Sequence, residues 1–125
     1  MAVRILIAEG DTEQRNLIRQ TAKLADDCEI VGYARDGREA VQMALQLDPD
    51  IVLLAYDLPG LNGPEACETL TTLKPEIMTV LLSDSKSHEQ TEHALRAGAR
   101  GLIARPVSVR QLNALISISL LPKTG

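Results

Sequence analysis

Residues 49–63 read PDIVLLAYDLPGLNG, a continuous apolar run followed by a loop of turn-forming residues. The run itself, IVLLA at residues 51–55, does not alternate polar with apolar side chains. A strand without alternation is typical of a parallel sheet that helices cover on both faces. The stretch therefore predicts a central strand of an α/β domain.

Four other short apolar runs have the same character: residues 5–8, 30–34, 79–83 and 101–104. Between the runs, apolar residues recur at helical spacing, as Leu17 and Leu24 do in the first segment. Residues suited to helix ends accompany these segments: Asp11, Asp36 and Ser108 as N-terminal caps, Pro64 in a first turn and Gly98 at a C-terminal end. The pattern predicts five βα units and a doubly wound sheet.

Composition limits the function. With 125 residues, 45% hydrophobic and 24% charged, the chain is the size of one domain. We expect this domain to occupy residues 1–120, with 121–125 a tail or the start of a linker. A net charge of −4 argues against nucleic-acid binding by this domain. No apolar run approaches the roughly 20 residues of a membrane span, and the N-terminus turns acidic too early for a secretory signal. We expect a cytoplasmic protein.

Five stretches together resemble the receiver domains of response regulators, the CheY-like family. They are VRILIAEGD (3–11), EIVGYARDGREAVQMA (29–44), PDIVLLAYDLPGLNG (49–63), TVLLSDS (79–85) and ALRAGARGLIARP (94–106). The resemblance covers nearly the whole chain. It implies a flavodoxin-like parallel sheet of order 2-1-3-4-5 with its site beyond the carboxyl ends of the strands. It also implies that one pocket gathers Glu9, Gly10, Ala55, Tyr56, Asp57, Ser83, Asp84 and Arg105.

The chain departs from the family at the residues that carry the chemistry. In the family, the position of Ala55 is the aspartate that accepts a phosphoryl group, and a methyl group offers neither a nucleophile nor a metal ligand. The acid pair that holds magnesium is reduced to Glu9 and Gly10. Glu9 and the carbonyl of Asp57, the only candidate ligands, leave most of an octahedral shell empty. The resemblance therefore implies a degenerate pseudo-receiver that has no catalytic residue, no enzyme activity and no cofactor.

Without a metal, Glu9 is expected to be a partly solvated carboxylate. Arg105 replaces the family's lysine, and we expect it to form an ion pair with Glu9 or Asp57. Ser83 retains the family's switch hydroxyl, whereas Leu102 replaces the aromatic partner and is expected to be partly exposed. The Arg105–Pro106 peptide is expected to be cis, as in the family.

Function would then depend on a folded surface. The resemblance implies contact with a protein partner or a second copy through the fourth helix, the strand at 101–104 and the following helix, in bacterial two-component signalling. The expected contact residues mix both charge signs around two apolar side chains. They are Glu92, Arg96, Arg100, Leu102, Val107, Arg110 and Gln111.

Two alternatives stay open. Asp57 is a possible substitute phosphoacceptor, because it lies two residues past Ala55 on the same loop. Alternatively, Ala55 is an engineered replacement in an ordinary receiver. Gly10 and Arg105 argue against engineering, since a designed knockout would rarely change the metal site and the lysine as well.

Overall fold

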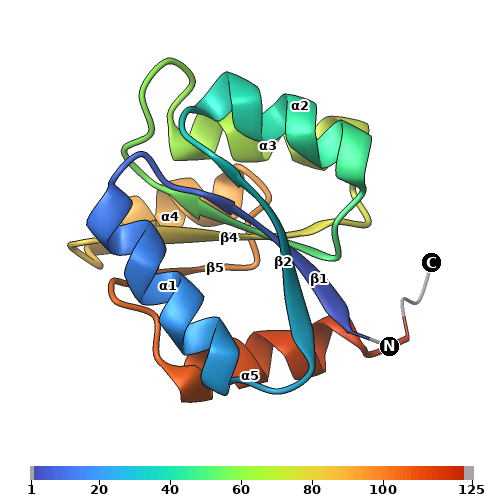
Figure 1. Ribbon diagram of the computed structural model, residues 1–125. Coiled ribbons are helices and arrows are strands. Elements are labelled where there is room, and N and C mark those ends of the chain that lie inside the picture. Colours follow the sequence, from blue (N-terminus) through green and yellow to red (C-terminus); the bar gives the residue numbers. More distant parts are fainter. Residues whose placement is uncertain (1, 123–125) are drawn as a thin grey trace.

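The computed structural model describes residues 2–122, in which five strands alternate with five helices (Figure 1). The strands are β1 (Val3–Ala8), β2 (Cys28–Ala34), β3 (Ile51–Ala55), β4 (Met78–Ser83) and β5 (Gly101–Ala104). The helices are α1 (Thr12–Leu24), α2 (Gly37–Leu47), α3 (Gly63–Leu73), α4 (His88–Arg96) and α5 (Val109–Ser119). All strand pairs are parallel and their order is β2-β1-β3-β4-β5, which confirms the predicted fold.

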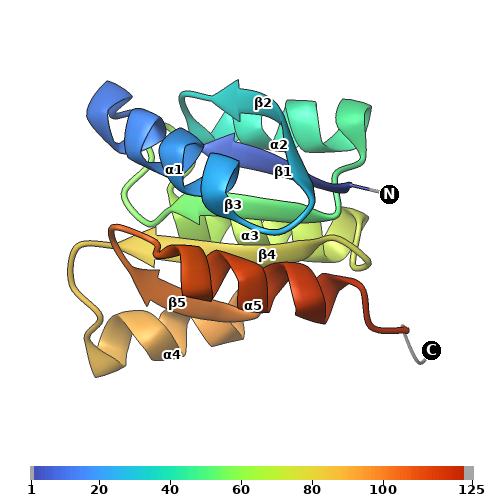
Figure 2. The same cartoon turned by 60° about the horizontal axis from the view of Figure 1, so that its bottom comes forward.

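The helices form two layers on the central sheet. α1 and α5 cover one face, and α2, α3 and α4 cover the other (Figures 1 and 2). Because side chains alternate along a strand, neighbouring residues of β3 enter different halves of the core. Leu53 packs with Ile18 and Leu112 under α1 and α5, whereas Leu54 packs with Leu70 on the opposite side. This burial on both faces explains the unbroken apolar runs.

Helix ends follow the predicted signals. Asp11, Asp36 and Ser108 each accept backbone N–H groups as N-caps. Gly98 has a φ of 96°, the left-handed conformation predicted for the end of α4. The helical spacing predicted α1 itself but not which of its side chains are buried. Leu24 and Leu17 are 76% and 37% exposed, because α1 reaches the core chiefly through Ile18.

The last helix of the described residues, α5, ends at Ser119. The domain limit at residue 120 stays a prediction. Of the predicted tail, residues 123–125 lie outside the described part of the chain. No helix within residues 2–122 has the length and apolar character needed to cross a membrane. The Arg105–Pro106 peptide is cis, as predicted.

Candidate functional site

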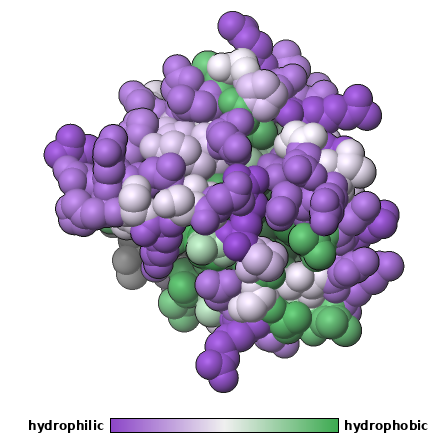
Figure 3. Space-filling model, turned by 90° about the vertical axis from the view of Figure 1, so that its left-hand side faces the viewer, coloured by the Kyte–Doolittle hydropathy of each residue, from purple (hydrophilic) through white to green (hydrophobic). Residues whose placement is uncertain are grey.

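A hollow of about 390 Å³ lies at the carboxyl edge of the sheet. Figure 3 looks onto this side of the molecule, whose centre is strongly hydrophilic, whereas apolar side chains gather toward its lower edge. Tyr56 and Ser83, expected in the pocket, do not line the hollow. The lining residues are Glu9, Gly10, Asp11, Gln14, Ala55, Asp57, Leu58, Pro59, Asp84 and Arg105.

Arg105 occupies the centre of this site. Its Nη1 donates to Glu9 Oε1 at 2.7 Å, and its Nη2 donates to Asp57 Oδ1 at 3.1 Å. The pairing therefore involves both of the predicted partners. The sequence did not indicate a third contact: Nε lies 3.1 Å from Asp84 Oδ1, within ion-pair distance but not aligned as a hydrogen bond. The Arg105 backbone N–H donates to the Ser83 carbonyl, which fixes the start of the side chain beside β4.

Burial sets the electrostatics of the pair. Glu9 is 2% exposed, so the expectation of a partly solvated carboxylate is wrong. Removal from water raises the pKa of Glu9 above its ordinary value of 4.5, and Arg105 only partly opposes this effect. Burial by itself would lower the pKa of Arg105, but Glu9, Asp57 and Asp84 raise it overall. Arg105 thus remains a fixed cation that faces three carboxylates.

Ala55 ends β3 with its methyl group 1% exposed. The loop after β3 returns tightly over it, because the Tyr56 carbonyl accepts the N–H of Gly63 at 3.0 Å. A β-carbon on Gly63 would lie 2.4 Å from the Ala55 carbonyl oxygen, so only glycine fits this approach. The main chain at position 55 is therefore closely packed, but the side chain there carries no oxygen.

The donor set of this hollow does not suit magnesium. Among residues 2–122, no group of three or more His, Cys, Asp or Glu side chains is arranged to hold a metal ion. The guanidinium of Arg105 already contacts the carboxylates of Glu9 and Asp57, and neither Gly10 nor Ala55 has a side-chain ligand atom. A divalent cation needs several free oxygen ligands, so these residues do not fit one.

Comparison with known proteins places the chain in a family. A sequence model described as "Response regulator receiver domain" matches residues 5–117. The chain belongs to this family. The receiver domain is 31% identical over 108 residues to the nitrate/nitrite response regulator protein NarL of Escherichia coli K12, which covers 86% of this chain and 50% of NarL. It is 32% identical over 107 residues to a protein-glutamate methylesterase of Thermotoga maritima, covering 83% of this chain and 30% of that enzyme.

Solved structures share the receiver fold. The signal receiver domain of NarL from Mycobacterium tuberculosis has a TM-score of 0.88 at 22% identity, covering 94% of this chain and 96% of that one. The response regulator domain of Thermotoga maritima CheB has a TM-score of 0.79 at 28% identity, covering 95% and 94%. This receiver domain spans half the length of NarL and under a third of the methylesterase. The methylesterase activity named for that relative is therefore not assigned to this chain.

Ser83 ends β4 and Leu102 lies in β5, the two positions that the family resemblance indicated for a switch. The buried Ser83 hydroxyl donates to Gln90 Oε1 of α4 at 2.6 Å and accepts the N–H of Ser85 at 3.2 Å. Leu102 is 3% exposed, so the prediction of partial exposure is wrong. Its side chain faces the layer of α2, α3 and α4 and packs in the same cluster as Ala94 of α4. The Ser83 hydroxyl is therefore hydrogen-bonded to α4, and the Leu102 side chain is part of the core.

A second contact between the pocket loop and α4 was not predicted. The Tyr56 hydroxyl lies 2.8 Å from His93 Nδ1, and the two rings meet edge to face. His93 is exposed despite this hydrogen bond. The residues are 37 positions apart, and no local pattern in the sequence links them.

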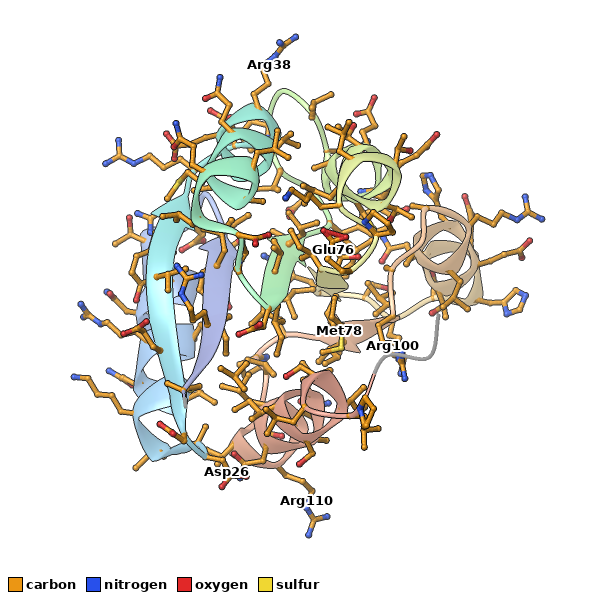
Figure 4. All side chains as sticks on the ribbon, turned by 90° about the vertical axis from the view of Figure 1, so that its right-hand side faces the viewer. Asp26, Arg38, Glu76, Met78, Arg100 and Arg110 are labelled. Atoms are coloured by element: carbon orange, nitrogen blue, oxygen red, sulfur yellow. The ribbon has the colours of Figure 1, made fainter. Side chains whose placement is uncertain are left out.

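The expected protein-contact surface is only partly exposed. Val107, like Leu102, is 3% exposed, so neither offers an apolar centre for a partner. Val107 packs with Leu112 and Ile116 beneath α5. The polar members remain on the surface, and Figure 4 shows Arg100 and Arg110 projecting from separate parts of it. The exposed members are Glu92, Arg96, Arg100, Arg110 and Gln111.

Proposed function

We propose that this receiver domain is degenerate and acts in bacterial two-component signalling without phosphorylation, as a cytoplasmic protein-interaction module. The observation that carries the proposal is the guanidinium of Arg105, held by Glu9 and Asp57 beside the methyl group of Ala55. A phosphoacceptor needs a carboxylate nucleophile at the end of β3 and positive charge free to meet the phosphoryl oxygens. Here the nucleophile is replaced, and the positive charge is already paired.

Magnesium is not required under this proposal. In phosphoryl transfer, the metal neutralises charge that develops on the phosphoryl group. In this domain the buried Arg105 side chain instead neutralises Glu9 permanently. The pocket then has a structural role: it holds the β1, β3 and β5 loops together in one state.

The proposed contact surface is the polar face of α4 and α5 with the start of β5. Its exposed charges have both signs, with Arg96 paired to Glu92 on α4 and with Arg100 and Arg110 in no ion pair among residues 2–122. Such a surface suits a specific polar contact, either with a protein partner or with a second copy of this chain. A related complex supports the use of this fold in protein contacts: a chain of the CheX–CheY–BeF3–Mg complex of Borrelia burgdorferi has a TM-score of 0.84.

Acetyl phosphate with magnesium, followed by intact-mass measurement, tests phosphorylation independence. We expect no phosphoryl adduct, whereas a receiver with an aspartate at the position of Ala55 gains one under the same conditions. Asp57 is the alternative acceptor, because its side chain is 71% exposed and lies in the pocket. An adduct that is absent from the Asp57→Asn variant would establish that alternative and overturn the proposal.

The contact surface has a separate test. An Arg100→Glu/Arg110→Glu variant reverses two exposed charges on this face. Lys23→Glu/Arg38→Glu is the matched control, since it reverses two exposed charges on α1 and α2. We expect the first variant alone to weaken self-association in sedimentation, or recovery of partners in a pull-down. Equal behaviour of the two variants would remove this face from the proposal.

A further inference from the structure

A second, smaller hollow lies between the first half of α1 and the end of β2, beside the degenerate pocket and lined by different residues. The two elements are packed against each other (Figure 2). The groove has a volume of about 260 Å³. Its lining residues are Thr12, Arg15, Asn16, Arg19, Tyr33 and Arg35.

Three arginines converge here without carboxylate partners. Within residues 2–122, the ion pairs use Arg4, Lys74, His88, Arg96 and Arg105 as their cations, and none uses Arg15, Arg19 or Arg35. The chain as a whole carries a net charge of −4, so its overall composition does not account for a local cluster of unneutralised cations. Such a cluster attracts an anion.

The arginine side chains are partly positioned in advance. Arg15 donates from Nη1 to the Glu9 carbonyl at 2.7 Å and from Nη2 to Thr12 Oγ1 at 2.9 Å. Arg19 Nη2 donates to Asn16 Oδ1 at 3.2 Å. Each guanidinium has five N–H donors, so these contacts hold the groups in place and leave donors for a ligand. The Arg35 backbone N–H donates to Glu39 Oε1, and Arg35 is a lining residue of the groove.

The lining also indicates the class of anion. Planar guanidinium groups bind phosphate oxygens in pairs, with short charge-assisted hydrogen bonds. Tyr33 adds a ring that is 36% exposed at the same groove, and an exposed aromatic face can stack on a nucleobase. We propose that this groove binds a nucleoside monophosphate, with its phosphate on Arg19 and Arg35 and its base against Tyr33.

Ligand binding at this groove would let the domain respond to a signal without the phosphoacceptor aspartate that is missing at position 55. Arg15 lines the groove and holds the main chain of Glu9, and the Glu9 carboxylate in turn holds Arg105. Ligand contact with Arg15 therefore reaches the degenerate pocket through two hydrogen-bonded residues. The binding proposal itself stands whether or not Asp57 accepts phosphate.

Calorimetric titration of the whole chain with AMP, GMP, CMP and UMP at low salt tests the proposal. We expect saturable binding of at least one nucleotide, weaker binding of inorganic phosphate, and none of the matching nucleoside. Arg19→Gln/Arg35→Gln should weaken binding about tenfold or more, because two charge-assisted contacts are lost. Both side chains are exposed, and Arg15 is left intact because it supports Glu9.

Arg100→Gln/Arg110→Gln is the matched control, since it removes the same charge from exposed positions elsewhere. It should bind the nucleotide as the unaltered chain does. Tyr33→Leu should weaken nucleotide binding and leave phosphate binding unchanged. The proposal fails if no nucleotide binds saturably, if both arginine variants lose affinity equally, or if phosphate alone binds as tightly as the nucleotide. Tighter binding of an acidic peptide at these arginines would also overturn it.

Discussion

Arg105 Nη1 lies 2.7 Å from Glu9 Oε1, and the two side chains are only 7% and 2% exposed. This ion pair joins the loop after β5 to the end of β1, 96 residues away in sequence. Burying two charges costs much of what their attraction contributes, so the pair adds little net stability compared with apolar residues. Breaking it is a different matter, because one charge would then be buried without a partner.

Arg105→Met should destabilise the domain by about 3–5 kcal/mol at pH 7, since Glu9 keeps its burial and loses its cation. The effect should depend on pH. Glu9 already has a pKa above 4.5, and removing Arg105 raises that pKa further. Protonation then favours the folded state, so the loss should be small below pH 4.5 and should grow as the pH rises through the folded-state pKa. Urea unfolding at pH 4 and pH 7 measures this difference.

The double variant Glu9→Gln/Arg105→Met is the control for this explanation. It removes the unpaired carboxylate as well as the cation, so much of the lost stability should return at pH 7. Its unfolding free energy should also vary less with pH than that of Arg105→Met. If the double variant is as unstable as Arg105→Met at both pH values, lost packing rather than an unpaired charge explains the result.

Ala55→Asp alone should not create a working phosphoacceptor. The new carboxylate would stand at a position that is 1% exposed, so a loss of stability is expected. Arg105 would still be paired with Glu9, and Gly10 would still provide no second acid. After treatment with acetyl phosphate and magnesium, intact-mass measurement should show no adduct.

The triple variant Gly10→Asp/Ala55→Asp/Arg105→Lys restores every family residue of the pocket and should gain a magnesium-dependent adduct of one phosphoryl group. A β-carbon at position 10 would lie 3.2 Å from the Arg35 carbonyl, which requires only a small shift. Phosphorylation of the single Ala55→Asp variant would show that Arg105 and Gly10 are not obstacles.

The sequence predicted the architecture well because local chemistry determines it. The bounds of β3 and β5 match the apolar runs, and Ser108 caps α5 as expected. The face on which a side chain lies was harder to predict. Leu102 was expected to be partly exposed, at the position of the family's aromatic residue, but strand alternation turns it toward the layer that contains α4. That direction depends on how the whole sheet is covered.

Contacts between segments that are distant in the sequence were also difficult to predict. The Arg105–Glu9 pair was predicted because the family resemblance brought both residues to one pocket. Asp84 was expected in the pocket but not as a partner of Arg105, and the Tyr56–His93 hydrogen bond was not expected at all. These contacts depend on side-chain directions at the ends of different strands, which residue spacing does not reveal.

Gly63→Ala should destabilise the domain by more than 1 kcal/mol, because the new β-carbon would collide with main-chain atoms of Ala55 and Tyr56. Main chain at the end of a central strand cannot move aside as a flexible side chain can. Gly101→Ala is the matched control, since a β-carbon there meets nothing within 4 Å. Chemical denaturation should show Gly101→Ala near or above the unaltered stability. Similar losses in both variants would contradict the close approach at Gly63.

Two hydrogen bonds fasten α4 to the carboxyl edge of the sheet: Ser83 to Gln90, and Tyr56 to His93. Ser83→Ala and Tyr56→Phe each remove one hydroxyl group and should cost about 0.5–1.5 kcal/mol, with the larger effect at the buried serine. Loosening should be local, so backbone amides of α4 should exchange hydrogen faster while those of β1 and β3 keep their protection.

Thr69→Val is the control for these α4 variants, because it also removes a hydroxyl hydrogen bond, but one that lies within α3 and reaches only the Glu65 carbonyl. Hydrogen-exchange mass spectrometry should show unchanged α4 exchange in this variant. The double variant Ser83→Ala/Tyr56→Phe should accelerate α4 exchange more than either single change, because the two bonds join α4 to different strands. If α4 exchanges at the same rate in all four variants, these bonds do not hold the helix, and its position must come from its other contacts, such as the apolar packing of Ala94 and the hydrogen bond from Thr71 to the Ala97 carbonyl.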